Sequence, residues 1–217
     1  MRVRKIVNRG STTKVIGKFP SLKMGKTVWF ESQIERDYIY LLEFDGDVLS
    51  YQEQPEKVRY RREGKTHTYT PDFLVRRTDG EQLVEVKPEE QLASEKNVAL
   101  FRSVAPVIRE QGREFLVITD RMIRTQPRLD NIKLLWRYAR VPILPRHHLY
   151  CQHLLSGGRQ VSLAEMFDFF RSKRVPLETA YALLYRGVIG TDLTWPVGHS
   201  SMVFLPAAAS AAGRKAS

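Results

Sequence analysis

The chain of 217 residues has little of several features that define whole classes of protein. It has one cysteine, Cys151, which excludes an internal disulfide and fits a reducing compartment. No apolar run approaches the ~20 residues of a membrane-spanning helix, and the amino terminus has no apolar signal-peptide stretch. We therefore expect a cytoplasmic protein without a membrane partner.

Acidic residues are absent from the first thirty positions, although the chain as a whole carries a net charge of +11. Basic arms of this kind bind phosphate backbones, whereas the alternative is a solvated tail that favours solubility. Glycines at 10, 17 and 25 disfavour a helix. We predict that residues 1–30 form a flexible arm that orders on DNA, with these candidate contacts: Arg2, Arg4, Lys5, Arg9, Lys14, Lys18, Lys23 and Lys26.

An amphipathic helix is predicted over residues 31–44. At about 100° per residue, its apolar stripe contains Ile34, Tyr38, Leu41 and Leu42, with Gln33, Arg36, Asp37 and Tyr40 on the opposite side. Glu31 and Glu35 lie on or beside the apolar stripe. Glu31 is close enough to the helix start to interact with the helix dipole. Glu35 lies a full turn further in, so it is a candidate functional acid that needs a cation or hydrogen-bond donors.

A short apolar strand predicted at 82–87 carries two charged residues, Glu85 and Lys87. Since side chains two residues apart point to the same face, Glu85 and Lys87 lie together and Val84 and Val86 lie on the other face. Such a pair is often only a solvated ion pair. Asp72, which follows Pro71, favours a catalytic interpretation, because two carboxylates can bind a hard divalent cation.

Four linked motifs follow one another along the chain: Glu31-Ser-Gln-Ile-Glu35-Arg, Tyr51-Gln-Glu-Gln54-Pro55, Tyr69-Thr-Pro-Asp72-Phe and Val84-Glu85-Val86-Lys87-Pro88. Together they resemble the TnsA endonuclease family, which supplies a DNA-cutting subunit of heteromeric cut-and-paste transposons. The resemblance runs from about residue 18 to about residue 138 in the family's order and spacing. It implies a restriction-endonuclease-like nuclease core of the α/β class.

The resemblance also implies roles for individual residues. The family's acid–acid–lysine site corresponds to Glu35, Asp72 and Lys87, and Glu85 stands where the family has Glu or Gln. We predict that Asp72, Glu85 and the Val86 carbonyl bind Mg²⁺, with Mn²⁺ as a possible substitute. Glu35 would hold a second metal or a water, and Lys87 would orient the attacking water. Glu31 matches no catalytic position of the family.

The family implies partners as well as chemistry. The expected substrate is double-stranded DNA at the 5′ ends of a transposon, and the expected partners are a transposase subunit and an AAA+ ATPase regulator, in a bacterial cytoplasm. Two alternatives stay open: a stand-alone restriction or repair nuclease of the same fold, and a non-catalytic DNA-binding assembly subunit. Transposase and AAA+ genes beside the coding gene would distinguish the transposon nuclease from the stand-alone nuclease. Unchanged biological function in Asp72→Ala would favour the non-catalytic subunit.

The rest of the chain indicates further organisation. A β–α–β unit with a parallel strand pair is predicted over 82–119, inside a catalytic domain at 31–141. A strand is expected to return over 67–75, and a helix to run from Pro88 to about Gln111. A winged-helix-like domain is predicted at 146–205, with a capping box at Ser162 to Glu165, and either DNA or a protein could be its partner. Residues 206–217 are expected to be a disordered tail.

Overall fold

The computed structural model describes residues 15–206. The chain divides into two compact units, Met1–Thr125 and Gln126–Ser217. The boundary expected at 141–146 would place residues 128–139 in the first domain, whereas the observed division places them in the second unit. Helices and sheets occur in both units, so the protein is of the mixed α/β class. No helix between residues 15 and 206 combines the length and apolar character that crossing a membrane requires.

A four-stranded sheet with the order β3-β6-β7-β8 forms the centre of the first unit. The first two pairings are antiparallel and β7 pairs with β8 in parallel, so the predicted parallel pair is confirmed. Helix α2 connects these two strands, but it begins later than predicted because a short 3-10 turn follows Pro88. The bounds are β3 Val48–Glu53, β6 Phe73–Arg77, β7 Gly80–Lys87, α2 Glu95–Glu110 and β8 Glu114–Thr119.

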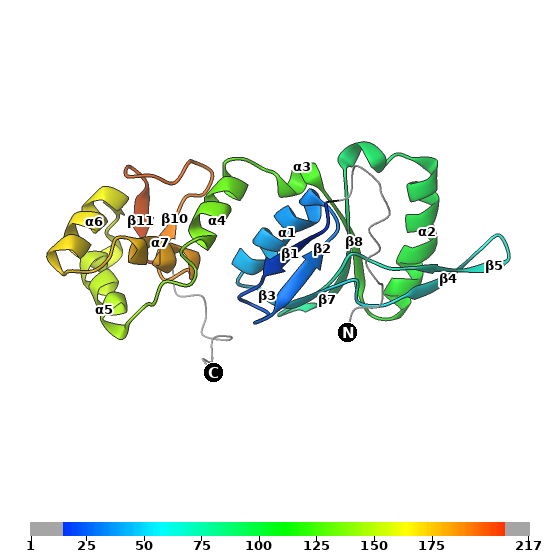
Figure 1. Cartoon of the computed structure of the whole chain (residues 1–217), viewed down its shortest axis with the longest axis horizontal. Coiled ribbons are helices and arrows are strands. Elements are labelled where there is room, and N and C mark those ends of the chain that lie inside the picture. Colours follow the sequence, from blue (N-terminus) through cyan, green and yellow to red (C-terminus); the bar gives the residue numbers. More distant parts are fainter. Residues whose placement is uncertain (1–14, 207–217) are drawn as a thin grey trace. The chain divides into compact units, whose positions relative to one another are not determined.

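Different helices cover the two faces of this sheet (Figure 1). The ring of Phe73 packs edge-on against Tyr38 of α1 (Gln33–Phe44), with 5.6 Å between the ring centroids. Leu74 is the next residue and therefore points to the opposite face, where it packs in a cluster with Ile108 of α2. The sheet is thus buried on both sides, and its strand ends lie between two helices.

A two-stranded hairpin adds to the α2 side of the sheet. Its strands are β4 (Val58–Arg62) and β5 (Lys65–Tyr69). The prediction of one continuous return strand over 67–75 is wrong, because β5 ends at Tyr69 and β6 begins at Phe73. Pro71 lies in the break, where a residue without a backbone N–H cannot continue a ladder. The break separates the hairpin from the main sheet.

Helix α1 begins at Gln33, two residues later than predicted. Ser32 is its N-cap, because the Ser32 hydroxyl accepts a hydrogen bond from the backbone N–H of Glu35 at 3.1 Å. Glu31 therefore lies before the helix. Because the helix begins at Gln33, Glu35 lies in its first turn, where a side chain can accept hydrogen bonds from the N-cap residue.

The buried face of α1 is rotated from the predicted stripe. Tyr38 and Leu42 are buried as expected, but Ile39 joins them and Ile34 keeps partial exposure. Asp37, predicted on the polar side, is only 3% exposed. The guanidinium of Arg124 pairs with it at 2.8 Å, which compensates the buried charge.

Residues 17–30 correct the flexible arm expected for 1–30. They form an antiparallel hairpin of β1 (Gly17–Pro20) and β2 (Thr27–Phe30). Phe19, Val28 and Phe30 are buried, which gives this segment a core contact that a solvated arm lacks. Residues 1–14 and 207–217, and with them the tail prediction, lie outside the described part of the chain.

A buried carboxylate fastens this hairpin to helix α1. Glu43, 5% exposed, accepts hydrogen bonds from the Ser21 hydroxyl at 2.5 Å and the Tyr51 hydroxyl at 2.7 Å. The backbone N–H groups of Leu22 and Lys23 also donate to it, at 3.0 and 3.2 Å. Glu43 thus ties the β1–β2 turn, α1 and β3 together through one charged acceptor.

The second unit contains a three-stranded sheet with the order β10-β11-β9 together with helices. The capping box is confirmed at its Ser162 half, since the Glu165 N–H donates to the Ser162 hydroxyl at 3.1 Å. The winged-helix assignment stays a prediction. The bounds are α4 Arg128–Trp136, α5 Pro145–Leu154, β9 Val161–Ser162, α6 Leu163–Ser172, α7 Glu178–Tyr185, β10 Gly190–Thr191 and β11 Met202–Phe204.

We expect Glu43→Gln to lower the free energy of unfolding of the first unit by about 2 kcal/mol, because a neutral amide replaces a charged acceptor and turns an NH₂ group toward donors. Urea denaturation followed by tyrosine and tryptophan fluorescence measures this. The exposed Glu110→Gln is the matched control and should change stability by less than ~0.5 kcal/mol. Equal stability of the two variants would contradict the role of Glu43.

Candidate active site

Glu85 is a buried carboxylate in the middle of the site. It lies in β7 and is 3% exposed. The ammonium of Lys87 pairs with its Oε1 at 2.6 Å, and the Tyr69 hydroxyl donates a short hydrogen bond to its Oε2. Alternation along the strand brings Glu85 and Lys87 to the same face. Both oxygens of the carboxylate thus have a partner that offsets the cost of burial.

Asp72 is fastened to the same strand. It precedes β6, and its Oδ2 accepts a hydrogen bond from the backbone N–H of Val86 at 2.8 Å. Its own carbonyl accepts from the Gln54 N–H at 2.8 Å. The two bonds hold the Asp72 side chain against β7 beside Glu85, so that a loop residue and a strand residue share one site.

Glu35 reaches the site from the first turn of α1. Its carboxylate accepts hydrogen bonds from the Glu31 N–H at 2.8 Å and from the Ser32 hydroxyl at 2.9 Å. With the reciprocal bond to Ser32 this is a capping box, a pattern that the spacing Ser32-x-x-Glu35 contained. The Glu31 N–H and the Ser32 hydroxyl are thus the hydrogen-bond donors that this carboxylate was expected to need, and Glu35 lies in the first turn of the helix rather than a full turn further in. Glu31 in turn accepts from the Gln54 side chain at 2.8 Å.

Burial and the neighbouring carboxylates raise the pKa of both Asp72 and Glu35. Burial raises the pKa of Asp72 well above its ordinary range, and the carboxylates of Glu85 and Glu35 raise it further against the opposing hydrogen bond from Val86. Burial likewise raises the pKa of Glu35, with Glu31 and Glu85 adding to the shift. The folded state therefore concentrates negative charge that it does not fully compensate.

Lys87 responds in the opposite sense. Burial by itself lowers the pKa of this ammonium, but the carboxylates of Glu85, Asp72 and Glu35 together raise it above the ordinary value. Lys87 is therefore protonated at neutral pH. In that state it can donate hydrogen bonds and stabilise negative charge, but it cannot accept a proton from water.

The donor set suits a hard cation. Asp72 and Glu85 offer carboxylate oxygens and Val86 a backbone carbonyl, which are ligand types that Mg²⁺ and Mn²⁺ prefer. The raised pKa of Asp72 also fits, since a cation would relieve the repulsion between the acids. Within residues 15–206, however, no three His, Cys, Asp or Glu side chains lie so that they could hold a metal ion. The hydrogen bonds of the Glu35 carboxylate keep it in the helix cap.

Lys18, Lys23 and Lys26 are the predicted DNA contacts that lie within the described part of the chain. Arg2, Arg4, Lys5, Arg9 and Lys14 lie outside the described residues. Lys18 and Lys26 are exposed, and the Lys18 ammonium lies 4.7 Å from the centre of the Trp29 ring. Lys23 instead donates to the backbone carbonyls of Asp45 at 2.5 Å and Val48 at 2.7 Å, and burial lowers its pKa. Lys23 thus has a structural role that competes with DNA contact.

The sequence analysis assigned no role to Tyr69 and Gln54, although both residues lie within the quoted motifs. Tyr69 contacts Glu85 only because the hairpin folds against α2. Gln54 is 6% exposed and has a φ of 43°, an unusual value for a residue with a side chain. It bonds the Asp72 backbone and the Glu31 side chain. The one sequence signal was the position of each residue beside a candidate acid.

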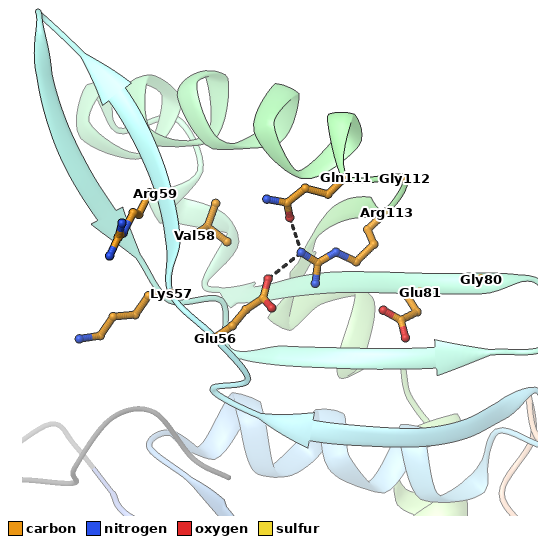
Figure 2. Close-up of a pocket in the computed structure, with 9 residues that line it drawn as sticks. All are labelled: Glu56, Lys57, Val58, Arg59, Gly80, Glu81, Gln111, Gly112 and Arg113. Atoms are coloured by element: carbon orange, nitrogen blue, oxygen red, sulfur yellow. Dashed lines mark hydrogen bonds and ion pairs between the residues drawn. The ribbon is translucent and has the colours of Figure 1, made fainter.

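An open hollow of about 870 Å³ lies elsewhere, at the base of the β4–β5 hairpin (Figure 2). None of the candidate acids lines it. Arg113 extends into it and pairs with Glu56 at 2.6 Å. The hollow is therefore separate from the site formed by Asp72, Glu85 and Lys87.

Comparison with protein families agrees with the resemblance in the motifs. Residues 45–120 match the family model described as TnsA-like endonuclease N terminal, which covers about a third of the chain. The match contains Asp72, Glu85, Val86 and Lys87, whereas Glu35 precedes it. No curated protein matches the chain.

We expect Asp72→Asn to raise the melting temperature at pH 8 by ~2–4 °C, because about 1 kcal/mol of repulsion disappears while the amide oxygen still accepts from Val86. A raised folded-state pKa gives stability that is present below the ordinary carboxyl value near ~4 and is lost as pH rises through the raised value. The gain should therefore vanish near pH 4. Calorimetry from pH 4 to 8 measures it, with the exposed Asp79→Asn as control. A lower melting temperature at pH 8 would contradict the assignment.

Proposed function

Because residues 45–120 are a TnsA-like endonuclease N-terminal domain, we propose that the chain is a metal-dependent DNA endonuclease subunit that cuts the 5′ ends of a transposon. The observation that carries the proposal is the arrangement of Asp72, Glu85 and Lys87 within the matched segment. A composition rich in Lys and Arg, with a net charge of +11, supports DNA as the substrate. The nuclease core would be of the restriction-endonuclease-like kind.

The proposed reaction is hydrolysis of a phosphodiester. The oxygen of a water attacks phosphorus, the bond between phosphorus and the 3′ oxygen breaks, and the water loses a proton while the leaving oxygen gains one. The products are a 3′-hydroxyl and a 5′-phosphate. Mg²⁺, when bound, supplies Lewis-acid stabilisation of charge on the phosphoryl oxygens.

Each residue of the cluster has a defined task in this proposal. Asp72, Glu85 and the Val86 carbonyl would hold the cation, with the Val86 N–H fixing the Asp72 carboxylate. Lys87 would stabilise the charge that develops on the phosphoryl group, because the acids keep it protonated. Glu35 would hold a second cation or a water, at the cost of its capping hydrogen bonds.

The proposed partners follow from the family. A transposase would cut and join the 3′ ends while this subunit cuts the 5′ ends, and an AAA+ ATPase would regulate the assembly. The second unit, with a fold we interpret as winged-helix-like, would bind DNA or one of these proteins. A bacterial cytoplasm is the corresponding location.

We expect Asp72→Ala to reduce 5′-strand cutting at least a hundredfold and to leave 3′-strand cutting intact, because the variant removes one ligand but no transposase chemistry. Strand-specific nicking of end-labelled transposon-end DNA with Mg²⁺ and the cognate transposase measures both cuts. The exposed Asp79→Ala is the matched control and should cut like the wild type.

Two outcomes would contradict the proposal. Equal 5′ cutting by Asp72→Ala and the wild type would show that the chain acts as a binding or assembly subunit. Rapid, unselective cutting of bare duplex by the purified chain would indicate a stand-alone nuclease instead.

A further inference from the structure

The β4–β5 hairpin has two chemically different faces. Cross-strand partners share a face, and the register pairs Val58 with Tyr69 and Tyr60 with His67. Val58, Tyr60 and Tyr69 on this face are buried against α2. The opposite face, which we call the basic face, is exposed throughout and consists of Lys57, Arg59, Arg61, Thr66 and Thr68.

The hairpin is held in place at three points. Its apolar face packs in one cluster with Val104 and Ile108 of α2. At its base, Arg113 bridges Glu56 and Gln111, so that the start of β4 is tied to the end of α2 (Figure 2). At the same end of the hairpin, Tyr69, the cross-strand partner of Val58, bonds Glu85 in the candidate active site. A ligand bound on the basic face would therefore be positioned relative to the acids.

Charge on the basic face is unbalanced. The acids near it have other partners, since Glu56 pairs with Arg113 at 2.6 Å and Glu63 with Arg62 at 3.3 Å. Across the described part of the chain no acid forms an ion pair with Lys57, Arg59 or Arg61. Figure 2 shows Lys57 and Arg59 directed to the same side, away from Val58 and α2. Three exposed cations on one face of the hairpin, none in an ion pair within the described residues, suit a polyanion.

We propose that the basic face of the β4–β5 hairpin binds the phosphate backbone of duplex DNA and positions it at the candidate active site. The inference rests on the proposed endonuclease function, and it adds a surface to which no role was assigned. Arg and Lys side chains neutralise phosphates, and the hydroxyls of Thr66 and Thr68 can donate to phosphate oxygens. Backbone contacts carry no sequence information, so this binding is independent of sequence.

The test compares two double variants of the full chain that lose the same charge from the same hairpin. Arg59→Gln with Arg61→Gln alters the basic face, whereas Arg62→Gln with Lys65→Gln alters the opposite face. Fluorescence anisotropy with a labelled 24-base-pair duplex, titrated at several KCl concentrations, gives log Kd against log salt. Melting temperatures establish that both variants are folded.

We expect the basic-face variant to bind more weakly and to lose ~1.8 from the salt slope, at ~0.9 for each lost phosphate contact. The opposite-face variant should keep the wild-type slope, and the basic-face loss should be the same on a duplex of unrelated sequence. Equal slopes for the two variants would overturn the basic-face assignment while wild-type binding and cutting left the endonuclease proposal intact. Absence of DNA binding by the wild type with its transposase would instead remove the proposed function and this inference together.

Discussion

The structure depends on how one buried carboxylate is compensated. Glu85 lies inside β7, where a charge without a partner would cost several kcal/mol, roughly what a whole domain has to spare. Lys87 and Tyr69 meet its two oxygens. Its partners come from β7 itself and from the end of the β4–β5 hairpin, and Asp72 lies close enough for the Glu85 carboxylate to raise the Asp72 pKa. The raised pKa of Asp72 means that the ionised Asp72 carboxylate destabilises the folded state, which is a cost in stability at the site.

In the proposed function, the β4–β5 hairpin links DNA binding to this cluster. Tyr69 ends β5 and reaches Glu85, while the preceding residues of the hairpin carry a row of cations on the opposite face. Two residues after Tyr69, Pro71 stops the ladder, and Asp72 then turns toward β7. One long strand was predicted here, but the chain bends between β5 and β6, and this bend places Asp72 in the site.

Local signals in the sequence predicted much of the core. Strand alternation was enough to place Glu85 beside Lys87, and the order of elements was enough to predict the parallel β7–β8 pair. The failures have tertiary causes. Asp37 is buried because Arg124, distant in sequence, pairs with it, and Tyr69 acquires its role only through packing on α2. The spacing Ser32-x-x-Glu35 already contained a capping box, and this local motif supplies part of the hydrogen bonding that Glu35 was expected to need.

The most direct test of the account is the location of the cation itself. Crystals of the full chain soaked in Mn²⁺ and measured at the manganese absorption edge would show each bound ion as an anomalous peak. We expect a peak between the carboxylates of Asp72 and Glu85 beside the Val86 carbonyl, and we expect this peak to disappear in Asp72→Ala. A strong peak elsewhere with none at these residues, or an unchanged peak in the variant, would contradict the claim that this cluster is a metal-dependent nuclease site.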